Sequence, residues 1–211
     1  SHYVWITDEK KIRYAFLVGI FFYLCYFLTN QGLILNTPVT LPLLPWEAQI
    51  PFLPITQWIY HLEVPFLIFI YLLLKTPLAR TRFAFSMIFL ILVCTFIFVF
   101  FPTTYPRDDF FPLLDPSNFH DQALRFFWLK VDHPINCFPS LHVATCYMVS
   151  FAMIEESRKK GLCAFIFSTL VALSTLTTKQ HYILDAVSGL ILSVGIYYGL
   201  SKRIKPPISN I

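Results

Sequence analysis

Six long apolar runs constrain the fold of this chain more than any other feature of its sequence. They lie near residues 14–30, 54–74, 83–101, 138–154, 161–178 and 182–200. A helix needs about 17–25 mainly apolar residues to cross a bilayer, so each run is long enough for one crossing. Only 13% of the residues are charged and the mean hydropathy is +0.63, outside the range of an ordinary water-soluble domain. The sequence therefore predicts an all-α integral membrane protein, a bundle of six transmembrane helices.

The distribution of Lys and Arg predicts how this bundle is oriented, because cationic loops stay on the cytoplasmic side. Six crossings place both termini on one side, and that side carries twelve of the 16 cationic residues: Lys10, Lys11, Arg13, Lys75, Arg80, Arg82, Arg158, Lys159, Lys160, Lys202, Arg203 and Lys205. The termini are therefore expected to be cytoplasmic. This topology accounts for the net charge of +4 without a nucleic-acid partner, and attraction to anionic lipid is compatible with it.

The rest of the chain gives no sign of a second domain. It contains no internal repeat and no long linker, so residues 1–211 are expected to form a single domain. The first apolar run is long enough to span and lacks a small-residue cleavage site, so it is interpreted as a helix and not as a signal peptide. The five cysteines suggest no disulfide framework, because four of them fall inside predicted spans. The Pro-interrupted stretch from Leu41 to Leu53 is expected to lie along the outer interface.

Candidate functional residues gather at the outer ends of the predicted spans. Pro139, Ser140, Leu141 and His142 open the fourth span, where Pro in the first turn and Ser beside it favour a helix start with N–H groups facing outward. Such a helix end attracts anions. The alternative is that Ser140 only caps the helix and His142 only lies at the interface.

A histidine and an aspartate open the sixth span at helical spacing. His181 and Asp185 are four residues apart, which places them on one helix face within reach of a hydrogen bond. A carboxylate bonded to one ring nitrogen fixes the tautomer and makes the other nitrogen a better nucleophile. A purely structural pair and a zinc site formed by His142, His181 and Asp185 are the two alternatives.

Other polar residues on the outer side are candidates for the edge of a site. Arg107 follows the third span after Thr103 and Tyr105, and Lys179 stands two residues before His181, so two cations flank the imidazoles. Arg is suited to phosphate oxygens, although either cation alone is as well explained by a headgroup boundary. His61 and Glu63 could close a pocket or simply lie at the interface. The outer-loop residues Arg125, Lys130 and His133 are expected on a solvated surface.

These motifs resemble the type-2 phosphatidic acid phosphatase superfamily. Pro139-Ser140-Leu141-His142, followed 39 positions after His142 by His181 and then by Asp185, is similar to two of its motifs in their order on the spans. The resemblance covers roughly residues 83–200. It implies a phosphoryl transfer that uses no metal or other cofactor, in which His181 attacks phosphorus and Asp185 holds its ring. His142 would protonate the leaving oxygen, and Ser140, Arg107 and Lys179 would bind phosphate oxygens.

The chain also departs from the usual motifs of that superfamily. Leu141 stands where the second motif usually has Gly, and Thr175 stands where the third motif commonly has Arg, so Lys179 is the candidate replacement. Tyr105-Pro106-Arg107 is the nearest equivalent of the first motif, with Tyr105 and Thr103 as possible pocket residues. These departures are similar to the branch that includes inositol phosphorylceramide synthases, whose members pass a phosphorylated headgroup to a lipid alcohol.

The leading hypothesis is therefore a membrane lipid phosphatase that hydrolyses a phosphate monoester or pyrophosphate through a phosphohistidine, on the outer (periplasmic or lumenal) face. The alternatives are a headgroup phosphotransferase and a non-enzymatic lipid-binding membrane protein. A transporter is disfavoured, because the spans lack paired Gly- or Pro-interrupted helices. The expected partners are a lipid phosphate and the bilayer, and the sequence specifies neither the lipid nor the oligomeric state.

Overall fold

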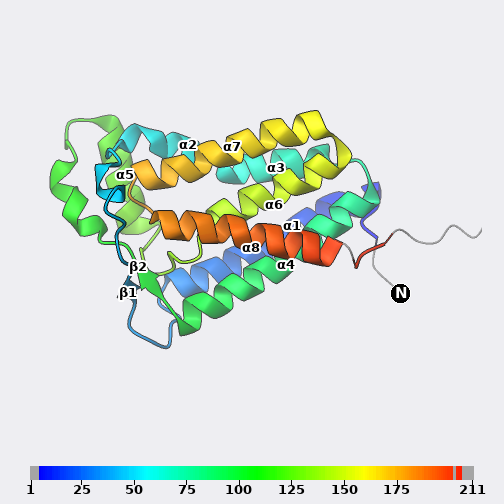
Figure 1. Ribbon diagram of the computed structural model, residues 1–211, viewed down its shortest axis with the longest axis horizontal. Coiled ribbons are helices and arrows are strands. Elements are labelled where there is room, and N and C mark those ends of the chain that lie inside the picture. The colour runs from blue at the N-terminus through cyan, green and yellow to red at the C-terminus, as the bar shows by residue number, and fades with distance from the viewer. Residues whose placement is uncertain (1–4, 202, 206–211) are drawn as a thin grey trace, which may run out of the picture.

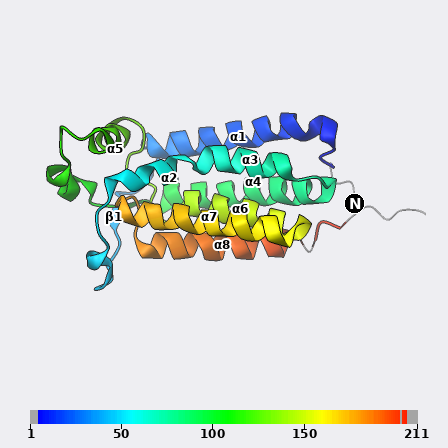
Figure 2. The same cartoon turned by 90° about the horizontal axis from the view of Figure 1, so that it is seen from above.

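The fold is an all-α bundle of long, roughly parallel and antiparallel helices (Figures 1 and 2). The computed structural model describes residues 5–201 and 203–205, so Lys202 of the predicted cytoplasmic set lies outside the described residues. The long helices are α1 (Asp8–Asn30), α3 (Glu63–Leu73), α4 (Pro77–Phe100), α6 (Leu141–Glu156), α7 (Arg158–Thr177) and α8 (Ile183–Ser201). The other helices are α2 (Gln57–His61) and α5 (Phe119–Lys130), and the 3-10 turns are η1 (Glu47–Gln49), η2 (Pro54–Thr56) and η3 (Arg107–Leu113).

Five segments within the described residues are long and apolar enough to cross a membrane: Asp8–Asn30, Pro54–Leu73, Pro77–Phe100, Arg158–Thr177 and Ile183–Leu200. They correspond to five of the six predicted spans. The second is not one continuous helix, because η2, α2 and α3 follow one another with a break at Leu62. The prediction of a multi-pass helical membrane protein is therefore confirmed.

The remaining predicted span, near 138–154, corresponds to the central helix of the bundle. Helix α6 has 16 residues, which at 1.5 Å per residue is about 24 Å and short of the ~30 Å hydrocarbon core. It contacts α3, α4, α7 and α8, and twelve of its residues are buried. Because its neighbours surround it, α6 needs less apolar length facing lipid than a peripheral helix. A sixth crossing stays a prediction.

Capping residues set where several helices begin. The Thr76 hydroxyl accepts a hydrogen bond from the Ala79 N–H, and Pro77 occupies the first turn of α4, where a missing N–H costs nothing. Asn118 caps α5 in the same way. Helix α1 starts at Asp8, earlier than predicted, because Asp8 and Glu9 interact favourably with its N-terminal dipole.

The functional end of the bundle is the one away from the termini. The start of α1 and the end of α8 lie together at one end, whereas α5 and the short parallel ladder of β1 (Val39–Thr40) and β2 (Thr103–Thr104) lie at the other (Figures 1 and 2). The stretch from Leu41 to Leu53 also belongs to that second end and contains only the 3-10 turn η1 among its regular elements. Loops from several parts of the chain therefore meet at the N-terminal ends of α6 and α8.

Candidate active site

His181 and Asp185 form the hydrogen bond that their spacing predicts, by a different local structure. Helix α8 begins only at Ile183, so His181 precedes the helix and Asp185 occupies its first turn. The Asp185 Oδ2 atom lies 3.2 Å from His181 Nδ1 and accepts a hydrogen bond of 2.9 Å from the Tyr182 N–H. Both side chains are buried, at 5% and 0% exposure. The carboxylate thus caps the helix start and orients the imidazole at the same time.

Ser140 is the N-cap of α6, and it joins the two motifs. Its hydroxyl accepts a hydrogen bond of 3.3 Å from the Val143 N–H, while its own N–H donates to the Asp185 carbonyl over 3.0 Å. Pro139 was expected in the first helical turn, but it lies before the N-cap. A Cβ atom at Gly189 of α8 would come within 2.5 Å of the Ser140 carbonyl oxygen. Only glycine allows α8 to approach the Pro-Ser-Leu-His segment this closely.

His142 has a carboxylate partner of its own. Its Nδ1 atom lies 2.5 Å from Glu63 Oε2, and the other carboxylate oxygen of Glu63 accepts a hydrogen bond of 2.9 Å from the Thr145 hydroxyl. The His142 Nε2 atom lies 3.3 Å from the Tyr26 hydroxyl. The rings of His142 and His181 lie 6.2 Å apart between centroids. Two histidine–carboxylate pairs therefore face one another.

Arg107 is buried beside the histidines and pairs with Asp132. Its two terminal nitrogens donate to the Asp132 backbone oxygen over 2.6 Å and to Asp132 Oδ2 over 3.0 Å. Burial alone would raise the pKa of the Asp132 carboxyl, but the guanidinium holds that pKa below its ordinary value. The Tyr26 hydroxyl and the Asn30 amide also donate to Asp132. Asp132 thereby connects the Arg107 side chain to α1.

A small polar cavity lies between these groups, and in this conformation it is too narrow to hold a water molecule, so a phosphate could enter only if the lining side chains moved apart. It is lined by Tyr26, Arg107, Asp132, Asn136, Cys137, Leu141, His142 and His181. Within the described part of the chain, Arg107 Nε and Asn136 Nδ2 are buried donors with no hydrogen-bond partner. A buried donor without a partner costs about 1–3 kcal/mol, so a group that accepts from both would be favoured here. A phosphate oxygen is such an acceptor.

The other predicted site residues lie around this cavity but do not line it. Thr103 accepts from the Phe138 N–H through its hydroxyl, and Tyr105 packs on Tyr182 at 4.5 Å between ring centroids. Lys179 donates to the Ile50 carbonyl over 2.7 Å and lies over the Phe110 ring. Burial lowers the pKa of the Lys179 ammonium. Through these contacts Lys179 anchors the loop that contains Ile50. Its phosphate-binding role stays a prediction.

The structure offers a different set of three ligands for the zinc alternative than the sequence predicts. Among the described residues, Cys137, His181 and Asp185 place one ligand atom each within 4.8 Å of one another, whereas His142 is not in this group. With no ion bound, burial raises the pKa of the Cys137 thiol. The Asp185 oxygen that bonds His181 is also committed to the Tyr182 N–H. The other carboxylate oxygen, Asp185 Oδ1, has no hydrogen-bond partner among the described residues, so a zinc site stays an alternative prediction, with Cys137 in place of His142.

Several residues of the site were not predicted from the sequence. Tyr26, Asp132, Asn136 and Cys137 line the cavity, and Glu63 was considered only as a pocket edge. A signal was available for Glu63, because an acidic residue inside an apolar run defaults to a functional role. His61, considered together with it, instead packs against Phe127 at 4.5 Å between ring centroids.

Comparison with known proteins agrees with this geometry. The sequence model of the PAP2 superfamily matches residues 35–199, which includes both histidine motifs and the third predicted span. The chain belongs to the PAP2 superfamily. It is therefore a membrane enzyme of the lipid phosphatase and phosphotransferase class. No match was found among curated proteins.

Proposed function

We propose that this PAP2 protein hydrolyses a phosphate monoester or pyrophosphate of a membrane lipid through a phosphohistidine on His181. The observation that supports this most strongly is the pair of facing histidines, each with its own carboxylate, 6.2 Å apart between ring centroids. A nucleophile and a general acid on opposite sides of a phosphorus atom require this kind of arrangement.

In the first half of the reaction, His181 attacks phosphorus. Its Nδ1 is engaged by Asp185, so Nε2 carries the lone pair that forms the N–P bond. The P–O bond to the lipid breaks, and its electron pair stays on the lipid oxygen. That oxygen takes a proton from Nε2 of His142, whose imidazolium form the Glu63 carboxylate stabilises through Nδ1. Arg107 and Asn136 supply their free N–H groups to the phosphate oxygens.

In the second half, His142 acts as the base. It takes a proton from water as the water oxygen attacks phosphorus, and the N–P bond breaks with its electrons returning to His181. A lipid alcohol in place of water would give the transferase, because it can occupy the same position and lose its proton to the same histidine. The two activities therefore share the phosphohistidine and differ only in the acceptor.

The test is release of inorganic phosphate by purified protein from a panel of lipid phosphates and pyrophosphates, with chelator present. We expect release by the wild-type chain and none by His181→Ala. His133→Ala is the matched control, because His133 belongs to the outer loop and does not line the cavity. Product that forms only with an added lipid alcohol would identify the transferase. Activity that survives in His181→Ala would contradict the mechanism, and loss of activity with chelator would instead support a metal at Cys137, His181 and Asp185.

A further inference from the structure

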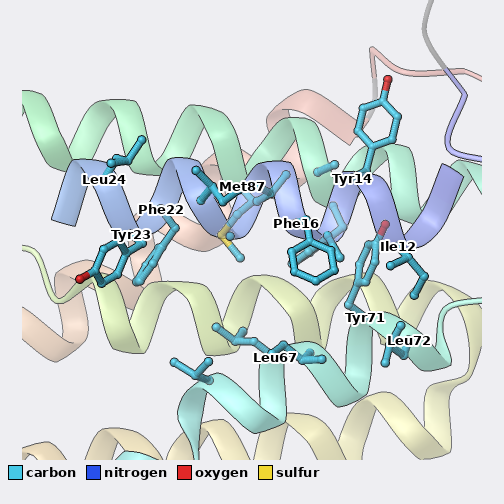
Figure 3. A pocket seen from close by; sticks show the side chains of 18 residues that line it. Ile12, Tyr14, Phe16, Phe22, Tyr23, Leu24, Leu67, Tyr71, Leu72 and Met87 are labelled. Atoms are coloured by element: carbon cyan, nitrogen blue, oxygen red, sulfur yellow. The ribbon is translucent and has the colours of Figure 1, made fainter. Parts of the chain in front are cut away.

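A second, apolar cavity lies on the flank of the bundle between α1, α3 and α4 (Figure 3). It is a groove of about 550 Å³, within the range of small-ligand sites. Phe16 and Phe22 of α1, Leu67 of α3 and Met87 of α4 belong to its lining and surround the same space in Figure 3. Its lining carries no charged residue within the described part of the chain. Such a groove suits a hydrocarbon chain.

One wall of the groove is a helix that is mostly surrounded by lipid. Only 6% of the most apolar window of α1 is buried in the protein, against 44% for α4. Helix α1 packs on α4 but touches α3 only slightly, so the groove lies where α1 and α3 make little contact. A lipid chain can enter from the bilayer without crossing a polar surface.

The outer end of the groove leads to His142. Phe22 lines the groove, and its ring stacks at 5.9 Å on Tyr26, whose hydroxyl lies 3.3 Å from His142 Nε2. On the other wall, Val64 lines the groove and directly follows Glu63, the carboxylate partner of His142. Both walls therefore end at residues that contact the proposed general acid. Tyr26 and Glu63 thus stand between the groove and the leaving-group side of the site.

The inner end of the groove is bounded by polar contacts. The Lys11 ammonium donates to the backbone oxygens of Leu72 and Leu74, and the Tyr71 hydroxyl donates to the Lys11 carbonyl over 3.1 Å. From Ile12 to Leu24 the lined part of α1 rises about 18 Å. That is a little over half of the ~30 Å hydrocarbon core, or one leaflet.

We propose that this groove holds a hydrocarbon chain of the lipid whose oxygen is protonated by His142. The proposal rests on the function proposed above and extends it, since it assigns the leaving lipid to a particular face of the bundle. A chain that enters from the bilayer is already in an apolar solvent, so the groove selects by fit and not by a hydrophobic gain. It positions the phosphoester oxygen under His142.

Glycines provide a matched pair of variants for the test. A Cβ atom at Gly19, in the groove wall, or at Gly195, on α8 outside the groove, would meet nothing within 4 Å. Since the first side-chain atom has open space at both positions, Gly19→Trp is expected to place its indole in the groove, and Gly195→Trp to add the same side chain elsewhere. The substrates are a long-chain lipid phosphate and a short, water-soluble alkyl phosphate, with the protein in nanodiscs.

We expect Gly19→Trp to lower kcat/KM for the long-chain substrate by at least about tenfold, because displacing a reacting group by about 1 Å can cost about a hundredfold. The short substrate should change by less than about twofold, and Gly195→Trp should leave both rates unchanged. Equal rates of Gly19→Trp and wild type on the long-chain substrate would overturn the proposal.

A binding measurement separates this proposal from the proposed function. A lipid phosphate with a photoactivatable group in mid-chain should label peptides that contain Phe16, Leu67 or Met87 in the wild type and in Gly195→Trp, with loss of the label in Gly19→Trp. Labelling without phosphate release would retain the groove and reject the hydrolase. Phosphate release with labelling elsewhere would retain the hydrolase and reject the groove.

Discussion

Replacing Glu63 by Gln tests whether a carboxylate controls the acid at His142. The variant keeps the size of the side chain and an acceptor for the Thr145 hydroxyl, but removes the negative charge beside His142 Nδ1. A hydrogen bond to a charged group contributes about 1.5–3 kcal/mol, against about 1 kcal/mol for a neutral one. The difference of about 0.5–2 kcal/mol corresponds to roughly a 2–30-fold loss in the rate of the step that His142 assists as an acid.

The choice of leaving group distinguishes this effect from a general loss of structure. An alkyl phosphate leaves as a basic alkoxide and needs the proton from His142, whereas p-nitrophenolate leaves without one. We expect Glu63→Gln to slow the first half-reaction with a lipid phosphate, followed in a single turnover as release of the lipid alcohol, by the factor above. The burst of p-nitrophenolate from p-nitrophenyl phosphate should change by less than about twofold, because with this substrate only the second half-reaction needs His142. Glu155→Gln, which removes a carboxylate paired with Arg82 at the opposite end of the bundle, is the matched control. An equal loss on both substrates, or none on either, would refute the reasoning.

Three further substitutions test the construction of the site. Gly189→Ala should lower both melting temperature and kcat, because its Cβ would lie 2.5 Å from the Ser140 carbonyl, and Gly195→Ala, with open space around it, should lower neither. Asp132→Asn should destabilise the protein by about 3–5 kcal/mol at pH 7, since it leaves Arg107 buried without its charge partner. The folded-state pKa of Asp132 is depressed, so this carboxylate stabilises the fold above the unfolded value of about 3.9 and loses that contribution as pH falls through the folded value. Melting curves of the wild type should show this acid-side loss and those of Asp132→Asn should not. Lys179→Ala should raise KM if the ammonium meets phosphate, and an unchanged KM with a lower melting temperature would leave it only as the tether of Ile50.

The sequence predicts the parts of this fold that depend on local pattern. Apolar length identifies α1, α4, α7 and α8, because a lipid-facing helix needs about 20 apolar residues regardless of its neighbours. It is less decisive for α6, whose position at the centre of the bundle relaxes that requirement. The break at Leu62 also escaped prediction, since nothing in the apolar run from 54 to 74 marks it apart from Glu63 beside it.

The two histidine–carboxylate pairs also differ in how far the local sequence pattern predicts them. His181 and Asp185 are only four residues apart, so the sequence predicts their contact, although it forms at the start of α8 and not within the helix. Glu63 and His142 are 79 residues apart, and Tyr26 and His142 are 116 apart, so only the packing of α3 on α6 and of α1 on α4 brings them together. Polar residues inside apolar runs, such as Asn30 and Glu63, indicate that a partner exists but not which residue it is.

The groove offers a structural explanation for whether water or a lipid alcohol accepts the phosphoryl group. An acceptor oxygen must occupy the position that the leaving oxygen vacates, because the same His142 gives up and takes back one proton. A lipid alcohol would reach that position along the groove between α1, α3 and α4, which ends at Tyr26 and Glu63, whereas water needs no groove. The variant Gly19→Trp narrows this groove. When a long-chain alcohol is added, phosphohistidine formed in this variant should therefore yield less phospholipid and more inorganic phosphate than in the wild type. A short soluble phosphate donor supplies the phosphohistidine in both proteins, so the ratio of the two products reports on the acceptor alone. An unchanged ratio would mean that acceptor lipids reach His142 by another route.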